Sequence, residues 1–334
     1  MPPAPLLRLT PAGLYCEAGD FHIDPWRPVA RAVVTHAHAD HARAGSEAYL
    51  ASAEGATLLR HRLGSGLPLE EVQWGERRRL GAVTVSLHPA GHIRGSAQVR
   101  VERDGEVWVV TGDYKRAADP TCTPFEPQRC HVLVTEATFA LPVYRWAPTA
   151  HVAAEIAAWV AACRDADRTA VLYTYALGKA QRLLAEVGPL VDVPILVHGS
   201  IAPINALFRE AGVKLPAATP VRESAGRDKV TRALVLAPPS AGVPGWLRRF
   251  RDPEIAFASG WMRLRGTRRR RALDRGFAIS DHVDWPALLQ TIEESGAERV
   301  LATHGDSAAL VRWLGERGVE ASALATEFRG EDAE

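Results

Sequence analysis

Three histidines and one aspartate lie within six residues of each other, directly after the apolar run Val33-Val34-Thr35. Two imidazoles placed two residues apart on an extended chain point to the same side. We therefore expect His36 and His38 to bind one metal ion, and Asp40 and His41 to bind a second, adjacent ion. The alternative is a polar surface turn with histidines by chance, but four metal-competent side chains at this density argue against it.

Three further candidate ligands, His92, Asp113 and His304, each follow an apolar run that predicts a strand. A sheet collects strand ends along one edge, so these side chains could converge on the first cluster. The expected set is His36, His38 and His92 on one metal, Asp40, His41 and His304 on the other, and Asp113 as a bridge. Such a binuclear site could use a shared hydroxide as its nucleophile. His and Asp donors without cysteine suit zinc, and also manganese or iron.

Composition places the chain among ordinary globular proteins. It has 334 residues, of which 47% are hydrophobic and 24% charged, and its net charge is only +1. The net charge does not indicate a nucleic-acid-binding protein, so any basic surface for nucleic acid must be local. Its four cysteines show no CxxC pairing, which favours a reducing cytoplasm. We expect neither a signal peptide nor a membrane span.

The hydrophobic pattern predicts three regions. The first alternates short strands with glycine-rich turns, and strands are expected at 13–16, 32–35, 83–88, 97–102, 107–111 and 132–135. The second alternates helix and strand, which favours a parallel sheet; its elements are expected at 151–164, 170–176, 178–187, 194–198 and 201–211. The tail is predicted to be helix, strand, helix, at 285–296, 299–303 and 307–317.

The order of the metal-binding motifs resembles the metallo-β-lactamase fold: His-x-His-x-Asp-His at 36–41, then Gly91-His92, then Thr111-Gly112-Asp113. Three further motifs resemble the nucleic-acid-processing β-CASP branch of that fold. They are Thr135-Glu136-Ala137-Thr138, Ser280-Asp281-His282-Val283-Asp284 and Thr303-His304-Gly305. Longer strings, such as Gly112-Asp113-Tyr114-Lys115-Arg116 and Leu141-Pro142-Val143-Tyr144-Arg145-Trp146, resemble the bacterial ligase-associated DNA exonuclease family.

This resemblance implies an α/β architecture, namely an αββα metallo-β-lactamase sandwich with an inserted β-CASP-like α/β cap domain. The implied domains are 1–147 for the first part of the sandwich, 148–278 for the cap and 279–334 for the return to the sandwich. The implied activity is metal-dependent hydrolysis of DNA from its ends, in repair alongside a ligase and a helicase. Two divalent ions are expected as cofactors, zinc first and manganese second. The implied location is the cytoplasm.

Phosphodiester hydrolysis also needs a proton for the leaving oxygen. Asp40 could hydrogen-bond the attacking water, and His282 is the candidate proton donor because imidazole titrates near neutral pH. Glu136 could orient His282, as a carboxylate does in hydrolytic triads. The alternatives are a strand-end carboxylate for Glu136 and a neighbour of a helix cap for His282. Asp24 could orient a metal ligand from behind or simply form a turn before Pro25.

Candidate phosphate contacts are basic or lie at a strand-to-helix junction. An arginine cluster offers bidentate phosphate binding, although a solvated loop is the usual meaning of such a charge run. Gly178 and Lys179 open a predicted helix, where backbone N–H groups favour phosphate. The full candidate set is Lys115, Gly178, Lys179, Arg263, Arg265, Arg268, Arg269, Arg270 and Arg271.

Other functions remain open at this point. An RNA-processing exo- or endonuclease of the same branch is the first alternative, because a histidine at the position of His304 is typical of the RNA enzymes. A small-molecule thioester or lactam hydrolase is the second, since the fold hosts many chemistries, although the inserted region and the arginine cluster disfavour it. A catalytically inactive scaffold subunit is the third, and the complete ligand set disfavours it.

Overall fold

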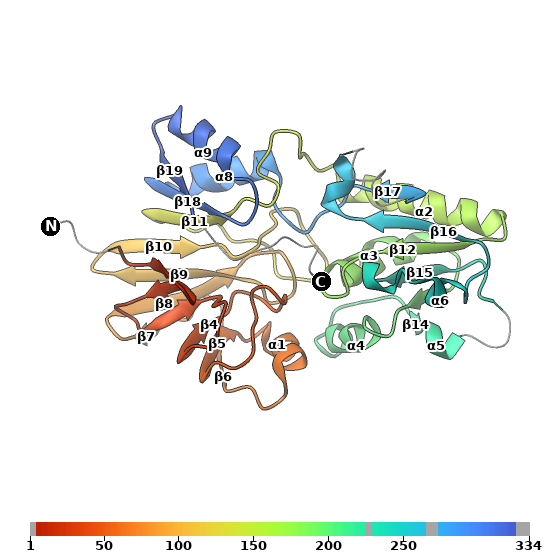
Figure 1. The fold of residues 1–334 in the computed structure, drawn as a ribbon, viewed down its shortest axis with the longest axis horizontal. Coiled ribbons are helices and arrows are strands. Elements are labelled where there is room, and N and C mark those ends of the chain that lie inside the picture. Colours follow the sequence, from red (N-terminus) through yellow and green to blue (C-terminus); the bar gives the residue numbers. More distant parts are fainter. Residues whose placement is uncertain (1–4, 225–228, 265–272, 325–334) are drawn as a thin grey trace. The chain divides into compact units, whose positions relative to one another are not determined.

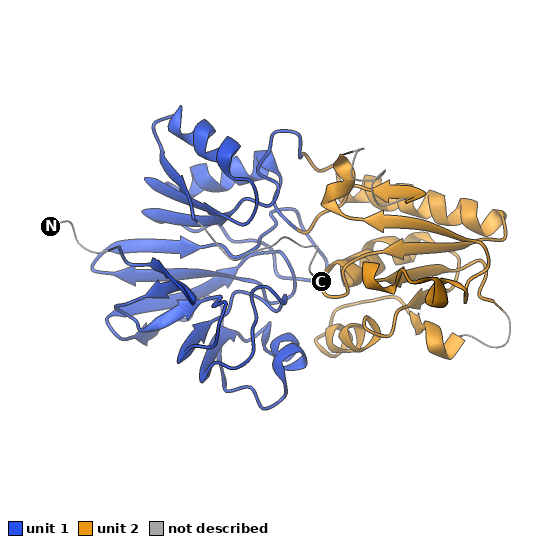
Figure 2. Cartoon of the chain, viewed as in Figure 1, with its two compact units in different colours: residues 1–144, 282–333 blue, residues 145–281, 334 orange. Residues whose placement is uncertain are grey.

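The computed structural model describes residues 5–224, 229–264 and 273–324. Its mixture of helices and three sheets confirms the expected α/β class (Figure 1). The chain divides into two compact units, drawn in blue and orange in Figure 2. Unit 1 comprises residues 1–144 and 282–333, and unit 2 comprises residues 145–281 together with residue 334. Each unit is described separately below.

The first sheet of unit 1 has six short strands in chain order. The first three pair antiparallel and the last four pair parallel. Its inward side chains are apolar and β-branched or aromatic, which suits a half-buried strand. The strands are β1 (Arg8–Thr10), β2 (Gly13–Cys16), β3 (Phe21–Ile23), β4 (Arg31–Val33), β5 (Ala48–Ser52) and β6 (Leu69–Val72). The helix α1 (Ala56–Leu63) lies between β5 and β6.

The second sheet of unit 1 has seven strands in the order β19-β18-β11-β10-β9-β8-β7. Neighbours from β7 to β10 pair antiparallel, whereas β10, β11, β18 and β19 pair parallel. The strands are β7 (Arg78–Leu80), β8 (Val83–Pro89), β9 (Ala97–Arg103), β10 (Glu106–Val110), β11 (Val132–Glu136), β18 (Arg299–Thr303) and β19 (Glu320–Ala323). The central strand β11 therefore pairs with β18, which lies far away in the sequence.

Two apolar cores hold unit 1 together. One contains side chains from both sheets, among them Val33, Leu50, Val99 and Val134. The other joins the opposite face of the seven-stranded sheet to α8 (Trp285–Ser295) and α9 (Ala308–Gly315). The ends of α8 are well defined, because the Asp284 side chain accepts a hydrogen bond from the Ala287 N–H at 3.1 Å. Gly296 ends the helix in the left-handed conformation.

Unit 2 contains the parallel sheet expected from its alternating helices and strands. Its strand order is β14-β13-β15-β12-β16-β17. The strands are β12 (Thr169–Tyr173), β13 (Ile195–Val197), β14 (Thr219–Pro220), β15 (Leu234–Ala237), β16 (Pro253–Ala258) and β17 (Arg275–Phe277). The α-helices are α2 (Thr149–Asp165), α3 (Lys179–Val187), α4 (Ala202–Glu210), α5 (Val221–Ser224) and α6 (Pro244–Leu247), and the short 3₁₀ turns are Gly188–Leu190, Pro239–Ala241 and Gly260–Arg263.

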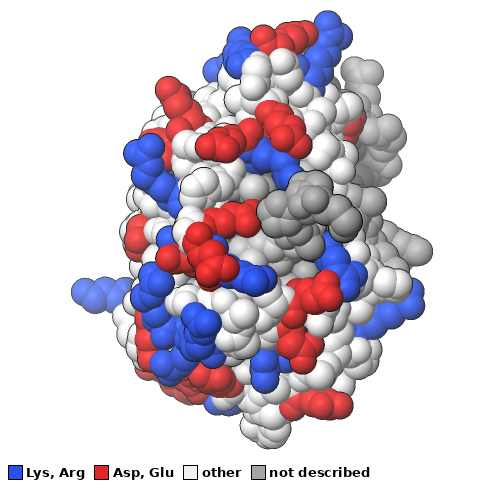
Figure 3. All heavy atoms as spheres, turned by 90° about the vertical axis from the view of Figure 1, so that its left-hand side faces the viewer, with Lys and Arg blue, Asp and Glu red and all other residues white. Residues whose placement is uncertain are grey.

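The surface matches the balanced composition. On the face shown in Figure 3, basic and acidic side chains lie interspersed over the described residues. Several charged side chains of the molecule form exposed ion pairs, such as Arg78 with Glu70 at 2.9 Å. Pairs of this kind contribute little stability, about 0–1 kcal/mol. Of the helices that the structure describes, none has the length and apolar character to cross a membrane.

Candidate metal centre

The loop that follows β4 is held by the partly buried carboxylate of Asp24. Both oxygens of Asp24 are used: Oδ1 accepts from the Thr35 N–H at 2.8 Å and Oδ2 from the Thr35 hydroxyl at 2.6 Å. Oδ2 also lies 2.7 Å from Nδ1 of His41. A carboxylate on one ring nitrogen fixes the orientation of the imidazole and leaves the other nitrogen for a metal. Asp24 therefore orients His41, which is one of the two roles that the sequence suggested for it.

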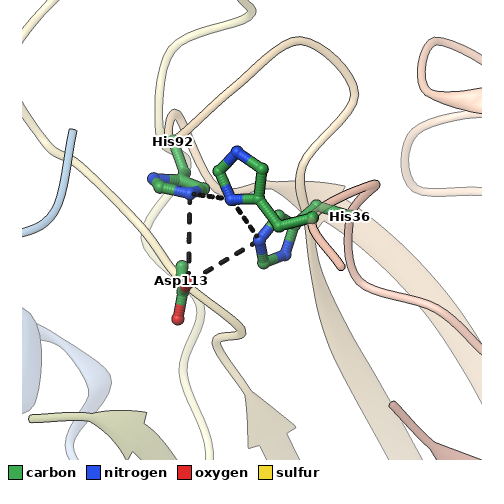
Figure 4. Close-up of side chains that lie close together, drawn as sticks. His36, His92 and Asp113 are labelled. Carbon is green, nitrogen blue, oxygen red and sulfur yellow. Dashed lines mark hydrogen bonds and ion pairs between the residues drawn. The ribbon is translucent and has the colours of Figure 1, made fainter. Parts of the chain in front are cut away.

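Four side chains form a first group that could hold a metal ion: His36, His38, His92 and Asp113. Their candidate ligand atoms all lie within 4.8 Å of one another. Nδ1 of His38 is 3.1 Å from Nε2 of His36 and 3.1 Å from Nε2 of His92. Figure 4 shows His36, His92 and Asp113 facing one another. Ring nitrogens that point at a common centre are the arrangement of a metal site with three imidazoles.

A second group contains His41, Asp113 and His304. Oδ2 of Asp113 lies 3.3 Å from Nε2 of His41, and Oδ1 lies 3.3 Å from Nδ1 of His304. Nε2 of His41 is buried and has no hydrogen-bond partner among the described residues. A buried, unsatisfied ring nitrogen beside a carboxylate fits a metal ligand. Together the two groups contain five histidines, one aspartate and no cysteine. This donor set suits a divalent ion such as zinc or manganese.

The predicted ligand set comes together with one difference at Asp40. Asp113 belongs to both groups, as a bridging carboxylate would. Asp40 lies outside the two groups, is 28% exposed, and its Oδ2 is 3.6 Å from Nε2 of His41. The segment with His36 and His38, expected to be extended, is irregular, whereas Asp40 and His41 lie in a turn, as the sequence indicated. The turn is closed by the Ala42 N–H, which donates to the His38 carbonyl at 2.8 Å.

Strand ends and close-packed turns position the ligands. β10 ends just before Asp113 and β18 just before His304, on either side of β11. The turn at Gly91 follows β8, and the His92 N–H donates to the Ser96 hydroxyl at 3.0 Å. Gly91 has a φ of +72°, and a Cβ there would lie 2.3 Å from the Lys115 carbonyl oxygen. Only glycine fits this approach, which brings the His92 turn against the segment after Asp113.

Burial and neighbouring charges set the protonation of the cluster. Burial lowers the pKa of His36 well below its usual value, and nearby His41 and His38 lower it further. Burial also disfavours the charged form of His41, but Asp113, Asp40 and Asp24 outweigh it and raise its pKa. Burial would raise the pKa of Asp113, yet His41 and His282 hold it well below its usual range. Asp113 is thus an ionised carboxylate surrounded by imidazoles.

Glu136 and His282 lie beside the metal groups. Glu136 ends β11, is fully buried, and its Oε2 lies 2.9 Å from Nδ1 of His282. Its Oε1 accepts from the Tyr114 N–H at 2.8 Å, which fixes the carboxylate. The candidate ligand atoms of Asp113, Glu136 and His282 also lie within 4.8 Å of one another, so these three residues could hold a metal ion as a third group. The pair therefore has the geometry of a carboxylate-oriented histidine, and a ligand role is the competing interpretation.

The candidate phosphate contacts differ from expectation. Lys115 is buried and its ammonium lies 2.5 Å from Asp119 Oδ2. Lys179 is also buried, 3.5 Å from Asp281 Oδ2 and 4.4 Å from the centre of the Tyr175 ring. Neither lysine presents its charge at the surface, because an internal carboxylate neutralises each one. Gly178 is buried and caps α3.

The arginine cluster is only partly described. Arg263 is exposed at the end of the 3₁₀ turn Gly260–Arg263. Arg265, Arg268, Arg269, Arg270 and Arg271 lie outside the described residues.

Sequence reasoning missed the part played by Thr35. Its hydroxyl donates to Asp24 and lies 3.0 Å from Nδ1 of His36 and 3.4 Å from Nδ1 of His41. One side chain therefore contacts the orienting carboxylate and a ligand of each metal group. The available signal was a hydroxyl residue at the end of an apolar run, directly before the first histidine.

No protein-family profile matches the chain, but several proteins are similar to it in sequence. A protein of Opitutus terrae named "Probable DNA ligase" is 34% identical over 319 residues, which cover 93% of this chain and 30% of that protein. An "RNase J-like protein" of Methanocaldococcus jannaschii is 26% identical, over 40% of this chain and 34% of that protein. "Endoribonuclease ysh1" of Aspergillus fumigatus is 28% identical, over 41% of this chain and 17% of that protein.

The chain spans about a third or less of the length of each of these relatives. A crystal structure of a protein of unknown function from Enterococcus faecalis superposes with a TM-score of 0.59, covering 90% of this chain and 80% of that one. At 12% identity this match shows a shared fold only. Together, the sequence relatives support the resemblance of this chain to metallo-β-lactamase-fold proteins of the β-CASP type, without selecting a branch among them.

Proposed function

We propose that this chain is a metal-dependent nuclease that hydrolyses phosphodiester bonds at DNA ends. One observation carries the proposal: Asp113 is shared by two groups of metal-competent side chains, with the Glu136–His282 pair directly beside them. A thiolate can leave a thioester without a proton, whereas the leaving oxygen of a phosphodiester benefits from a positioned acid. The same proposal makes unit 1 the αββα sandwich and unit 2 the β-CASP-like cap.

Two divalent ions, when bound, would lower the pKa of a water and neutralise the phosphoryl oxygens. His36, His38 and His92 would hold one ion, His41 and His304 the other, and Asp113 both. Asp40 lies next to His41 and would accept a hydrogen bond from the attacking water. His282 would donate the proton from its second ring nitrogen to the leaving oxygen. Glu136 would keep Nδ1 of His282 protonated and stabilise the positive ring.

DNA is the proposed substrate because the relative that covers 93% of this chain is named a probable DNA ligase. A nuclease joined to, or working beside, a ligase would prepare ends for sealing. Shorter similarities to proteins named as RNases, together with His304, favour RNA as the second candidate. A cytoplasmic location follows from a role in DNA repair.

Matched DNA and RNA oligonucleotides test the proposal. Each sequence is prepared with a 5′-phosphate or a 5′-hydroxyl, in single- and double-stranded form, and incubated with zinc or manganese. We expect DNA to be shortened stepwise from its ends, and chelation to stop the reaction. The Asp113→Asn variant serves as the inactive control. Faster cleavage of RNA would assign the second candidate, and no cleavage of either polymer by the metal-loaded chain would refute a nuclease.

A further inference from the structure

Unit 2 contains a pocket that the proposed chemistry does not use. It has a volume of about 420 Å³ and is lined by Tyr173, Pro239, Gly242, Leu247, Ile255, Phe257 and Leu273. Tyr173 ends β12, and Ile255 and Phe257 belong to the adjacent strand β16. α6 contributes Leu247. Apart from the Tyr173 hydroxyl, the side chains that line the pocket are apolar, and two of them, Tyr173 and Phe257, are aromatic.

One polar atom stands out in this apolar pocket. Tyr173 is only 7% exposed, and its hydroxyl has no hydrogen-bond partner among the residues that the structure describes. A Cβ built on Gly242 would lie 3.0 Å from that hydroxyl, so Tyr173 Oη sits at the glycine-lined wall. Leaving a buried hydroxyl unsatisfied costs about 1–3 kcal/mol. Burial raises the pKa of Tyr173, so the group stays a neutral donor at physiological pH. A ligand that carries a hydrogen-bond acceptor would therefore satisfy this hydroxyl.

Two exposed arginines, Arg248 and Arg249, directly follow the pocket-lining Leu247 in the chain. Within the described residues, neither side chain forms an ion pair, whereas the nearby Arg251 is paired with Asp167 at 3.0 Å. An apolar pocket whose lining segment continues into two arginines without ion pairs suits a ligand with an apolar ring and an adjoining phosphate. The ring would enter the pocket, and the phosphate would contact the guanidinium groups.

We propose that this pocket binds a nucleobase of a nucleic-acid strand held by unit 2. A base presents a flat aromatic face for Phe257 and Tyr173, and a ring nitrogen or carbonyl oxygen that can accept the Tyr173 hydrogen bond. Its phosphates would reach Arg248 and Arg249. The volume lies within the usual range for small-ligand sites, about 300–1,000 Å³. This inference rests on the proposed function, because it takes nucleic acid as the ligand.

A binding assay with two probes distinguishes recognition of the bases from recognition of the phosphates. One probe is a fluorescein-labelled single-stranded oligodeoxythymidylate, and the other is the same length with a tract of abasic residues. The full chain is titrated with each probe in a chelating buffer, so no hydrolysis occurs. We expect the abasic probe to bind about tenfold more weakly, the scale of one stacked base.

Substitutions test whether the preference for the base-containing probe arises in this pocket. Gly242→Leu fills the pocket, and we expect it to abolish the preference for bases. Gly245→Leu is the matched control, since it adds the same side chain to the neighbouring α6 where a Cβ meets only the end of Arg248 at 3.8 Å. Tyr173→Phe removes the hydroxyl alone and should weaken binding of the base-containing probe about threefold. The double variant Arg248→Ala/Arg249→Ala should weaken both probes equally.

Circular dichroism confirms that each variant is folded. A folded Gly242→Leu chain that still prefers bases would overturn the pocket assignment, as would equal binding of the two probes by the unaltered chain. A mononucleotide that competes as well as the oligonucleotide would assign the pocket to free nucleotides. Base preference without any hydrolysis in the metal-loaded assay would refute the nuclease and leave the pocket standing.

Discussion

At the scale of single residues, Asp113 links the components of the site. Its two oxygens contact different histidines, Oδ1 with His304 and Oδ2 with His41. It also lies in the same group as Glu136 and His282. Removal of Asp113 should therefore affect more than one metal, whereas removal of His304 should affect one.

Metal content measures this difference. We expect Asp113→Asn to lower the stoichiometry of both bound ions, because the amide keeps the shape but loses the bridging charge. His304→Ala should lower it by about one ion per chain. Inductively coupled plasma mass spectrometry on purified, metal-loaded protein gives the ratios. Equal losses in the two variants would contradict a bridging role for Asp113.

His282 can be assigned as acid or ligand by one substitution. His282→Ala should lower turnover about 10²- to 10⁴-fold, the usual contribution of a positioned acid. Metal content should stay at the level of the unaltered chain. A His282→Ala protein that loses an ion would instead show that Asp113, Glu136 and His282 hold a metal.

Lys115 illustrates a residue whose role the sequence did not reveal. Its ammonium is buried against Asp119, so Asp119→Ala leaves an unpaired charge in the interior and should cost about 3–5 kcal/mol of unfolding free energy. The double variant Lys115→Met/Asp119→Leu removes both charges and should recover most of that loss. Urea denaturation monitored by fluorescence measures the difference. If the double variant is as unstable as Asp119→Ala, the pair matters for more than its charge.

At the scale of elements, the ligands depend on how strands end. The strands predicted in unit 1 are present within one or two residues, because apolar and polar residues alternate clearly in segments such as β8 and β9. The pattern missed β1, β3 and β7, whose three residues each give no detectable period, and it also missed β5, β6, β19 and α1. The strand predicted at 170–176 ends at Tyr173, because the chain must turn into α3 through Gly178 at a φ of +87°.

The candidate metal ligands were foreseeable because several histidines and aspartates follow apolar runs in the sequence. Their partners in space were not, since Asp24 and Thr35 meet His41 only through tertiary contacts. The lysines at 115 and 179 were misjudged for the same reason: sequence shows a charge but not the carboxylate buried beside it. Local motifs specify ligand types, and packing decides which charges remain available.

Gly91 allows a test of how backbone approach supports the metal centre. Gly91→Ala adds a methyl that would lie 2.3 Å from the Lys115 carbonyl oxygen, besides the strain of a positive φ. Gly105→Ala has a similar φ, +88°, but nothing within 4 Å of its Cβ. Positive-φ strain alone costs about 1–2 kcal/mol, so Gly105→Ala should lose that amount. Gly91→Ala should lose clearly more and bind less metal; similar values by denaturation and metal analysis would contradict the close approach.

At the scale of the whole molecule, a net charge of +1 means that nucleic-acid binding must come from a local basic surface. Arg263, Arg248 and Arg249 are exposed basic side chains among the described residues of unit 2. The interspersed charges of Figure 3 create no single-sign field over that face. Binding should therefore depend on a few guanidinium groups instead of on long-range attraction.

The dependence of DNA affinity on salt concentration gives the number of these guanidinium groups that contact phosphate. We expect log Kd for single-stranded DNA to rise linearly with log salt concentration, with a slope of about 0.7 per phosphate contact. Arg263→Ala, in unit 2, should reduce the slope by about one contact, whereas Arg78→Ala, in unit 1, should leave it unchanged. Fluorescence anisotropy at several salt concentrations gives the slopes. A slope near zero for the unaltered chain would exclude an ionic interface.

The pairing of β11 with β18 has a consequence for the order in which a newly made chain becomes active. β11 emerges from the ribosome with one edge open, and its partner follows only after the whole of unit 2, a delay of roughly 10 to 30 s at usual synthesis rates. An open central strand is prone to pair wrongly. Unit 2 is almost continuous in sequence and can fold during this interval. His282 and His304 both follow unit 2 in the chain, so the proposed hydrolytic centre can be completed only after unit 2 has been synthesised.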